Sequence, residues 1–277
     1  MRQTRTTSGT GSRTGARGSA VLNVMCDAAG KAGRSLVRDF GDIENLQVSK
    51  KGPADFVSAA DHKAEKIIFE TLSRARPNFG FLMEERGVVE GADVSNRWIV
   101  DPLDGTLNFL HGLPHFAVSI GLERDGHLFA GVVYEPVSDQ MFWAEKGQGA
   151  FLNGRRLRVS ARQEFDESVF ATGIPFMGRE GHDAFLAQLQ QVMAISAGVR
   201  RFGSAALDLA YVAAGRYEGF WEQGLQPWDM AAGIVIVREA GGIVSDLANR
   251  QKMLASGEII ATNGTLHNDL RQLIRKA

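Results

Sequence analysis

The sequence predicts a mixed α/β (α+β) protein in which helices cover β-sheets. Apolar residues recur at helical spacing in two long segments near the N-terminus. Alternating apolar residues flank a turn in the middle of the chain, which is typical of a β-hairpin. After about residue 160, short apolar runs alternate with helical patterns. This change in the sequence pattern favours an α/β arrangement in the C-terminal half.

Two amphipathic helices are predicted before Pro77. Ser19 is a suitable N-cap for the first helix, whose apolar positions recur every three or four residues as far as Phe40. The second helix contains the apolar positions between residues 60 and 72, and Pro77 stops it. Both helices would bury one face against a core.

Strands dominate the predicted structure of the middle segment. One strand carries apolar residues at every second position, namely Phe116, Val118, Ile120 and Leu122. This alternation predicts a strand buried on one face only. Asp125-Gly126 would turn the chain back into a second strand at residues 129–134, and Asn153-Gly154 marks another hairpin.

The C-terminal half alternates between short strands and helices. Strands are expected at residues 169–171, 243–247 and 257–262. Helices are expected near residues 183–194, 204–215 and 265–276, and from about residue 228. Since neither an internal repeat nor a long linker interrupts this pattern, we expect an N-terminal half at residues 19–155 and a C-terminal half at residues 156–277.

Residues 1–18 differ in composition from the rest of the chain. They contain four arginines and no acidic residue, and are otherwise mostly Gly, Ser and Thr. Such a segment cannot bury enough apolar surface to order itself, so we expect a disordered tail. The arginines leave a targeting peptide or a nucleic-acid arm open as alternatives, although no apolar region typical of a secretion signal is present.

Composition is that of an ordinary globular protein. The 277 residues are 44% hydrophobic and 23% charged, with a net charge of -1. No apolar run approaches the roughly 18 residues that suggest a membrane span, so no membrane association is expected. The single cysteine, Cys26, excludes an intramolecular disulfide and fits a cytoplasmic protein. It lies among apolar helix positions, which favours a buried structural thiol.

The most informative motif follows the apolar run at residues 98–100. Asp101 and Asp104 come next, three residues apart, and Gly105-Thr106 follow where a helix could begin. Carboxylate oxygens at the end of a strand suit Mg²⁺ or Mn²⁺ better than zinc. Backbone amides at the start of a helix can hold an anion such as phosphate. The motif therefore indicates a metal site beside a phosphate site.

Two further segments also contain acidic residues at element ends. Glu84-Glu85 follows a short apolar run, and Asp229 precedes a helix-like run of small and apolar residues. Alone, each could be a solvated turn or a helix cap. Together with Asp101 and Asp104, they favour a shared site.

The order of these segments resembles the inositol monophosphatase family of Mg²⁺-dependent, Li⁺-sensitive sugar-phosphate phosphatases. Residues 98–111 match the family's Asp-Pro-(Ile/Leu)-Asp-Gly-Thr signature, and residues 228–242 match its Trp-Asp to Glu-Ala-Gly-Gly signature. Residues 203–210 resemble its substrate-side helix start. The likeness extends from about residue 20 to the C-terminus and is greatest to bacterial inositol-1-monophosphatases. Leu107 and Met83 depart from the pattern, at positions that supply no metal-binding side chain.

The resemblance implies a layered α-β-α-β-α sandwich and a complete set of site residues. The metal ligands would be Glu84, Asp101, the Leu103 carbonyl, Asp104 and Asp229. Asp101 would bridge two Mg²⁺ ions, and a third, weaker ion would lie near Glu84. The catalytic residues would be Glu84, Thr106 and Asp61, with Asp61 also serving as an N-cap. The substrate would contact Asp104, Gly105, Thr106, Ala205, Glu222 and Asp229.

The chemistry follows from charge. A phosphate monoester is an anion that repels nucleophiles, and its uncatalysed hydrolysis is very slow. Two cations about 3.5–4 Å apart can activate a water and stabilise the leaving oxygen. Glu84 and Thr106 would orient this water, and Asp61 would accept a hydrogen bond from Thr106. The resemblance implies that myo-inositol monophosphate is hydrolysed to inositol and phosphate. No covalent enzyme intermediate would form.

Alternatives remain for substrate and role. Histidinol phosphate or fructose 1,6-bisphosphate could be the phosphate monoester, because the catalytic residues are common to the superfamily. Some bacterial relatives also associate with the transcription machinery, so a regulatory role is a different class of alternative. The resemblance also implies a homodimer. Arg200 and Arg201 could anchor a second phosphate, but a subunit or sheet-edge contact is expected for them. His111 and His115 are expected to be structural or surface groups.

Overall fold

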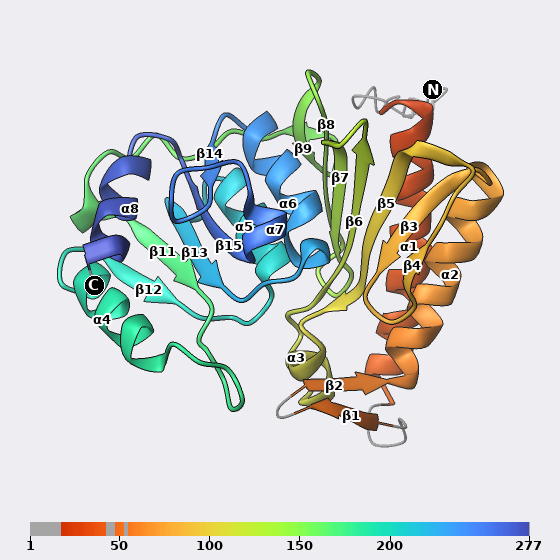
Figure 1. The fold of residues 1–277 in the computed structure, drawn as a ribbon, viewed down its shortest axis with the longest axis horizontal. Helices are drawn as coiled ribbons and strands as arrows, with labels where there is room; N and C mark the ends of the chain where they lie inside the picture. Colours follow the sequence, from red (N-terminus) through yellow and green to blue (C-terminus); the bar gives the residue numbers. More distant parts are fainter. Residues whose placement is uncertain (1–17, 43–47, 53–54, 277) are drawn as a thin grey trace, which may run out of the picture.

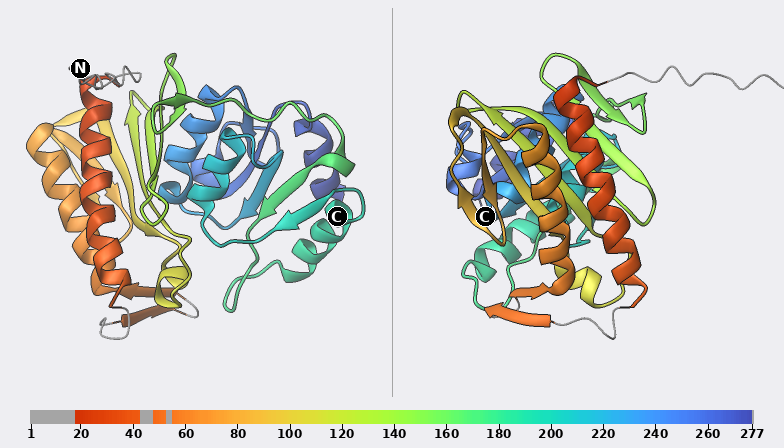
Figure 2. Two further views of the ribbon diagram at one scale, coloured as in Figure 1. Left: turned by 180° about the vertical axis from the view of Figure 1, so that it is seen from behind. Right: turned by 90° about the vertical axis from the view of Figure 1, so that its right-hand side faces the viewer.

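The computed structural model describes residues 18–42, 48–52 and 55–276. The side chains of residues 48–57 are outside this description, as is the predicted tail up to residue 17. Five layers make up the described part of the chain (Figure 1). Figure 2 shows the same layers from behind and from the side. The α-β-α-β-α sandwich is therefore confirmed.

The helices form the outer and central layers. The outer layer on one side consists of α1 (Ala20–Phe40) and α2 (Ala59–Ala75), and the central layer contains α5 (Ala205–Ala213) and α6 (Pro227–Glu239). The opposite outer layer consists of α4 (His182–Met193) and α8 (His267–Lys276). Both predicted N-terminal helices are confirmed. Ser19 caps α1 by accepting a hydrogen bond from the Leu22 amide at 3.3 Å.

The first sheet has eight strands in the described chain, in the order β10-β9-β8-β7-β6-β5-β3-β4. Its strands are β3 (Phe79–Met83), β4 (Gly87–Val89), β5 (Asp93–Asp104), β6 (Ala117–Arg124), β7 (His127–Glu135), β8 (Gln140–Glu145), β9 (Gly149–Leu152) and β10 (Arg155–Arg156). Only the β3–β5 pair is parallel among these neighbours. Both predicted turns are confirmed, because Asp125 and Asn153 have positive φ angles of 51° and 47°, as hairpin turns require.

One burial prediction was wrong. Residues 117–122 of β6 are buried at every position, whereas the alternation predicted burial on one face only. The reason is that α1 packs on one face of the sheet and α6 on the other. On β6, a Cβ added at Gly121 would lie 2.9 Å from the Ala231 Cβ of α6. The small residues of both elements thus allow a close sheet-to-helix contact.

The second sheet has five strands in the described chain, in the order β12-β11-β13-β15-β14. Its strands are β11 (Val169–Thr172), β12 (Gly198–Arg200), β13 (Gly219–Gln223), β14 (Ile243–Ser245) and β15 (Glu258–Thr262). The sequence did not predict β12 or β13, because β12 is three residues long and β13 has no clear alternation. The remaining short elements are β1 (Val48–Gly52), β2 (Asp55–Ser58), α3 (Thr106–Leu110), η2 (Phe165–Glu167) and α7 (Met253–Ser256).

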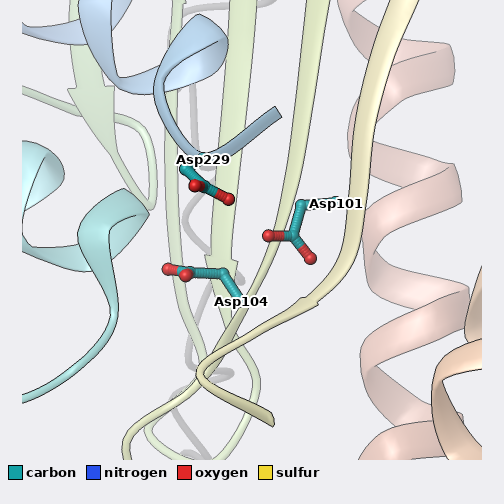
Figure 3. A group of neighbouring side chains, drawn as sticks. All are labelled: Asp101, Asp104 and Asp229. Carbon is teal, nitrogen blue, oxygen red and sulfur yellow. The ribbon is translucent and has the colours of Figure 1, made fainter. Parts of the chain in front are cut away.

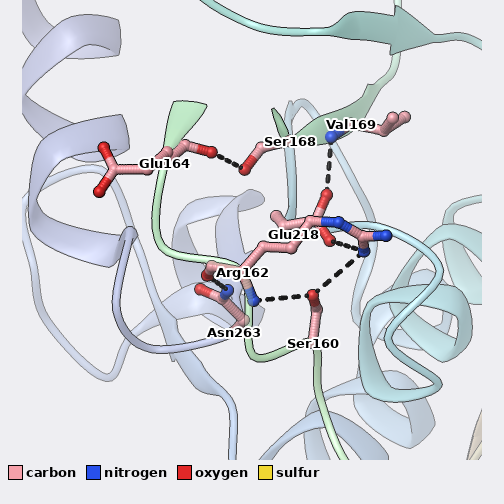
Figure 4. Close-up of polar contacts among 7 residues, drawn as sticks. All are labelled: Ser160, Arg162, Glu164, Ser168, Val169, Glu218 and Asn263. Atoms are coloured by element: carbon pink, nitrogen blue, oxygen red, sulfur yellow. Dashed lines mark hydrogen bonds and ion pairs between the residues drawn. The ribbon is translucent and has the colours of Figure 1, made fainter. Parts of the chain in front are cut away.

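The segment that joins the two sheets is held by a buried carboxylate (Figure 4). Glu218 is 1% exposed and accepts hydrogen bonds from the Val169 amide at 2.7 Å and from the Arg162 guanidinium at 3.0 Å. The Asn263 side-chain amide donates to the Arg162 carbonyl at 2.7 Å. These contacts attach the joining segment to the second sheet. The division of the chain at residue 155 stays a prediction.

Candidate metal and phosphate site

A cleft of about 220 Å³ lies where β5, α5, β13 and α6 meet. All of the residues predicted for the site except Asp61 line it, namely Glu84, Asp101, Leu103, Asp104, Gly105, Thr106, Ala205, Glu222 and Asp229. These residues come from both halves of the chain. The cleft is therefore built only when the two sheets are packed around α5 and α6.

Three carboxylates converge in this cleft (Figure 3). One oxygen each from Asp101, Asp104 and Asp229 lies within 4.8 Å of the others. The pairing of β5 with β6 is irregular between Asp101 and Asp104. Asp229 enters from the first turn of α6, where its carboxylate accepts a hydrogen bond from the Gln226 amide at 2.8 Å. Asp229 thus belongs both to the capping box of α6 and to the group of three carboxylates.

The electrostatics of the cluster suit a divalent cation. Burial, followed by the charges of Glu84 and Asp104, raises the pKa of Asp101 well above its usual value. Burial and the charge of Asp104 likewise raise the pKa of Asp229. The carboxylates of the buried Asp101 and Asp104 and the half-buried Asp229 repel one another, and a divalent cation would relieve that repulsion. Their hard oxygen donors fit Mg²⁺ or Mn²⁺.

Asp104 is held by the start of α5. Its Oδ2 accepts a short hydrogen bond from the Ser204 hydroxyl and a 2.9 Å hydrogen bond from the Ala206 amide. Burial raises the pKa of Asp104 to about 6, and these hydrogen bonds oppose the rise. Both hydrogen bonds go to Oδ2, and they orient the Asp104 carboxylate in the cleft.

Thr106 and Asp61 are neighbours, although 45 residues separate them in the sequence. The Thr106 hydroxyl lies 3.2 Å from Asp61 Oδ1 and 2.9 Å from the Leu103 carbonyl oxygen, so two acceptors are within its reach. Asp61 also accepts hydrogen bonds from the Ser58 amide at 2.9 Å and the Ser58 hydroxyl at 2.6 Å. Ser58 is therefore the N-cap of α2, not Asp61 as expected. Asp61 completes the capping box from the N3 position and also contacts Thr106.

The chain turns sharply from β5 into α3. Gly105 makes this turn with a φ of 92°, in the left-handed region that favours glycine. Asn108 fixes the start of α3 by donating to the His115 carbonyl at 2.8 Å and the Phe202 carbonyl at 2.7 Å. The Gly105-Thr106 segment thereby lines the cleft beside the carboxylates.

The opposite wall of the cleft carries Glu222. Burial raises the pKa of Glu222 to about 7; the charge of Asp104 raises it as well, and Arg201 and Arg179 lower it. Arg201 lines the cleft, where the alternative of a phosphate anchor would place it, and Arg200 lies on the edge strand β12, as expected. Sequence reasoning missed Arg179. Both arginines lie in segments without a recognisable motif, so only the fold brings them to Glu222.

His111 and His115 do not line the cleft. His111 is exposed at the end of α3, and His115 packs its ring against Phe202 and Tyr211 with centroid separations of 5.1 and 6.0 Å. These positions agree with the structural and surface roles that were expected. Among the described residues, no helix has both the length and the apolar character needed to cross a bilayer.

Comparisons with known proteins agree with this arrangement. Residues 18–277 match the model of the inositol monophosphatase family. An inositol-1-monophosphatase of Mesorhizobium japonicum is 60% identical over 93% of this chain and 97% of its own. The Nus factor SuhB of Escherichia coli is 44% identical over 88% and 91%. The crystal structure of the extragenic suppressor protein suhB from Bartonella henselae is similar with a TM-score of 0.92, at 59% identity over 94% and 100%. The chain therefore belongs to the inositol monophosphatase family.

Proposed function

We propose that this protein is a Mg²⁺-dependent phosphatase that hydrolyses myo-inositol monophosphate to inositol and phosphate. The observation that carries the proposal is the close cluster of Asp101, Asp104 and Asp229 in a cleft that Glu84 and Glu222 also line. The 60% identical relative is named an inositol-1-monophosphatase, which supports the choice of substrate. The reaction is hydrolysis of a phosphoric monoester.

Two cations fit the donor set. Glu84, Asp101 and the Leu103 carbonyl would hold one Mg²⁺, and Asp101, Asp104 and Asp229 would hold the other. A third, weaker Mg²⁺ would lie near Glu84. When bound, the cations offset the negative charge of the phosphate ester and lower the pKa of water.

The protein's own groups position the attacking water and the ester. Thr106 and Glu84 orient the water and accept its proton, and Asp61 holds the Thr106 hydroxyl in place. Gly105 and Thr106 would contact the phosphate. Thr106→Ala is therefore expected to slow the hydrolysis of all substrates alike.

The far wall of the cleft selects the leaving group. Glu222, the Ala205 amide and Asp104 would bind ring hydroxyls, which favours a polyol, and Asp229 would also contact the substrate. Histidinol phosphate and fructose 1,6-bisphosphate are the same-class alternatives, because they need the same catalytic residues.

A panel of phosphate monoesters tests the proposal. With Mg²⁺, inositol 1-phosphate should have a higher kcat/KM than histidinol phosphate, fructose 1,6-bisphosphate and phenyl phosphate. Glu222→Gln should reduce this preference while changing phenyl phosphate hydrolysis much less, since phenol has no ring hydroxyls to bind. Undiminished turnover in EDTA would contradict the role of the metals, and equal losses on both substrates would contradict the role of Glu222.

The SuhB relatives support a second candidate function. Escherichia coli SuhB is named a Nus factor, so an association of this chain with the transcription machinery is the alternative to a purely metabolic role. The four arginines of residues 1–17 are the sequence feature that favours nucleic acid. Deletion of residues 2–17 should weaken RNA binding without lowering phosphatase activity; unchanged RNA binding would exclude the tail as the contact.

We also propose a cytoplasmic homodimer. Support comes from the outer helix α4, where the apolar side chains of Leu186 and Met193 are 59% and 55% exposed seven residues apart. Light scattering of the purified protein tests this, and Leu186→Glu should shift a dimer towards the monomer.

A further inference from the structure

The carboxylate of Glu222 occupies the space where a side chain at position 173 would begin. A Cβ built on Gly173 would lie 1.9 Å from both Cδ and Oε1 of Glu222 and 2.3 Å from Oε2. These separations are far inside van der Waals contact. The two positions therefore compete for the same volume, and Gly173 leaves that volume to the carboxylate.

Backbone conformation does not explain a glycine at this position. Gly173 is not among the residues with positive φ, so an L-amino acid could adopt its backbone angles. The reason is instead the close approach of two parallel strands. Thr172 pairs with Trp221 in the register of β11 and β13, and the Thr172 hydroxyl donates to the Trp221 carbonyl at 2.8 Å. Gly173 is consequently held beside Glu222.

Gly173 and Glu222 also stand at a boundary between two cavities. The cleft with the metal cluster and a neighbouring cavity of about 450 Å³ share three lining residues, Gly173, Arg179 and Glu222. Arg179 is fixed there by a hydrogen bond to the Gly224 carbonyl at 2.6 Å. Gly173 and Arg179 thus line the same wall as the Glu222 carboxylate, between the two cavities.

We propose that Gly173 is a positioning residue for substrate selection: the absence of its Cβ lets the Glu222 carboxylate reach the ring hydroxyls of the polyol. The inference rests on the proposed function, since it takes Glu222 as the group that binds those hydroxyls. A methyl group at position 173 would push the carboxylate out of place. The polyol would bind more weakly, while Asp101, Asp104 and Asp229 would stay in place.

The test compares two substrates in Gly173→Ala. The ratio of kcat/KM for inositol 1-phosphate to kcat/KM for phenyl phosphate should fall by at least about fivefold, mainly through KM for inositol 1-phosphate. Gly30→Ala is the matched control, because an added Cβ there meets only the Arg34 guanidinium at 3.4 Å. The ratio should not change in this control. An unchanged ratio in Gly173→Ala would overturn the inference.

A compensating pair separates steric competition from a general loss of structure. Glu222→Asp shortens the acid by one methylene and makes room for the Cβ. The ratio in the double variant Gly173→Ala/Glu222→Asp should therefore be no lower than in Glu222→Asp alone, whereas independent effects would multiply. If Gly173→Ala does not fold, recovery of folding in the double variant supports the competition, and failure to recover contradicts it.

Glu222→Gln is the reference that distinguishes the two hypotheses. If it leaves the substrate ratio unchanged, the role of Glu222 in the proposed function is wrong and the role of Gly173 falls with it. If Glu222→Gln lowers the ratio and Gly173→Ala does not, only the inference about Gly173 is wrong.

Discussion

The hydroxyl of Ser204 donates a hydrogen bond to the carboxylate of Asp104, which ties the N-cap of α5 to the last residue of β5. The Ala206 amide donates to the same oxygen at 2.9 Å. One hundred residues separate Ser204 from Asp104 in the sequence. This contact joins β5 to α5 at the cleft, so the orientation of a proposed metal ligand depends on how the first sheet and the central helices pack.

Replacement of Asp101 by asparagine should abolish most of the activity. A neutral amide cannot bridge two dications, and a missing charge partner in the transition state costs about 3 kcal/mol, or roughly a hundredfold in rate. Steady-state kinetics with inositol 1-phosphate at saturating Mg²⁺ measures the loss.

Metal binding by Asp101→Asn can be measured without turnover. Addition of Mg²⁺ should raise the Tm of the wild-type protein, because a ligand that binds the folded state stabilises it. The rise should be much smaller in Asp101→Asn and unchanged in Asp166→Asn, an exposed acid of η2 that does not line the cleft. An equal Mg²⁺-dependent rise in all three proteins would place the ion elsewhere.

Lithium should inhibit at millimolar concentrations, more strongly when substrate is abundant. Li⁺ is close to Mg²⁺ in size but carries half the charge, so it can occupy an oxygen-lined site without supporting the same catalysis. We expect it at the site of Asp101, Asp104 and Asp229, after Mg²⁺ has left, where it would hold product phosphate in place. Inhibition should therefore favour the enzyme in turnover.

A grid of Li⁺ and substrate concentrations measures this effect. Inhibition should increase with substrate and should weaken when Asp229 is replaced by asparagine. Competition of Li⁺ with substrate, or complete insensitivity, would reject this assignment of the lithium site.

The buried His267 should make the protein less stable as the pH falls from 6.5 towards 4. Its side chain contacts the hydroxyls of Ser245 and Thr262 at 2.9 and 3.1 Å and is 3% exposed. Burial, and secondarily the charge of Arg271, lowers its pKa to about 4. The pKa of histidine in the unfolded chain is about 6.5, so between these values only the unfolded state binds the proton.

The stability that neutral His267 contributes is complete above about pH 6.5 and is lost as the pH falls to about 4, with a total of about 3 kcal/mol. Urea denaturation at pH 7.5 and pH 5.0 measures it. His267→Gln should show a smaller decrease in the free energy of unfolding over this interval; an identical decrease in both proteins would assign the pH dependence to other groups.

Glu218→Ala should destabilise the fold by about 2–3 kcal/mol. The change leaves the half-buried Val169 amide without this acceptor and removes the partner of Arg162. Arg162→Ala should cost less, because the Arg162 side chain is 52% exposed and Val169 keeps its hydrogen bond. Chemical denaturation compares the two, with the exposed Glu164→Ala as the control. A smaller effect for Glu218→Ala than for Arg162→Ala would contradict the role of the buried carboxylate.

The sequence alone determined the features that depend on neighbouring residues. Asp125-Gly126 and Asn153-Gly154 form the expected turns because both residues of each pair adopt positive φ. Ser19 caps α1 because its hydroxyl reaches an amide three residues away. The motif around Asp101 and Asp104 indicated a metal and phosphate site for the same reason, since both acids lie at the end of one strand.

Tertiary structure decided what depends on segments that are distant in the chain. The sequence could not predict burial of β6 on both faces, because the second covering helix, α6, begins more than a hundred residues later. Nor could it place Arg201 in the cleft or set Gly173 against Glu222, since both contacts arise from the packing of β11, β13 and α5. Local patterns specify turns, caps and strand ends, whereas the spacing between side chains of different strands is fixed only when the sheets and the central helices pack together.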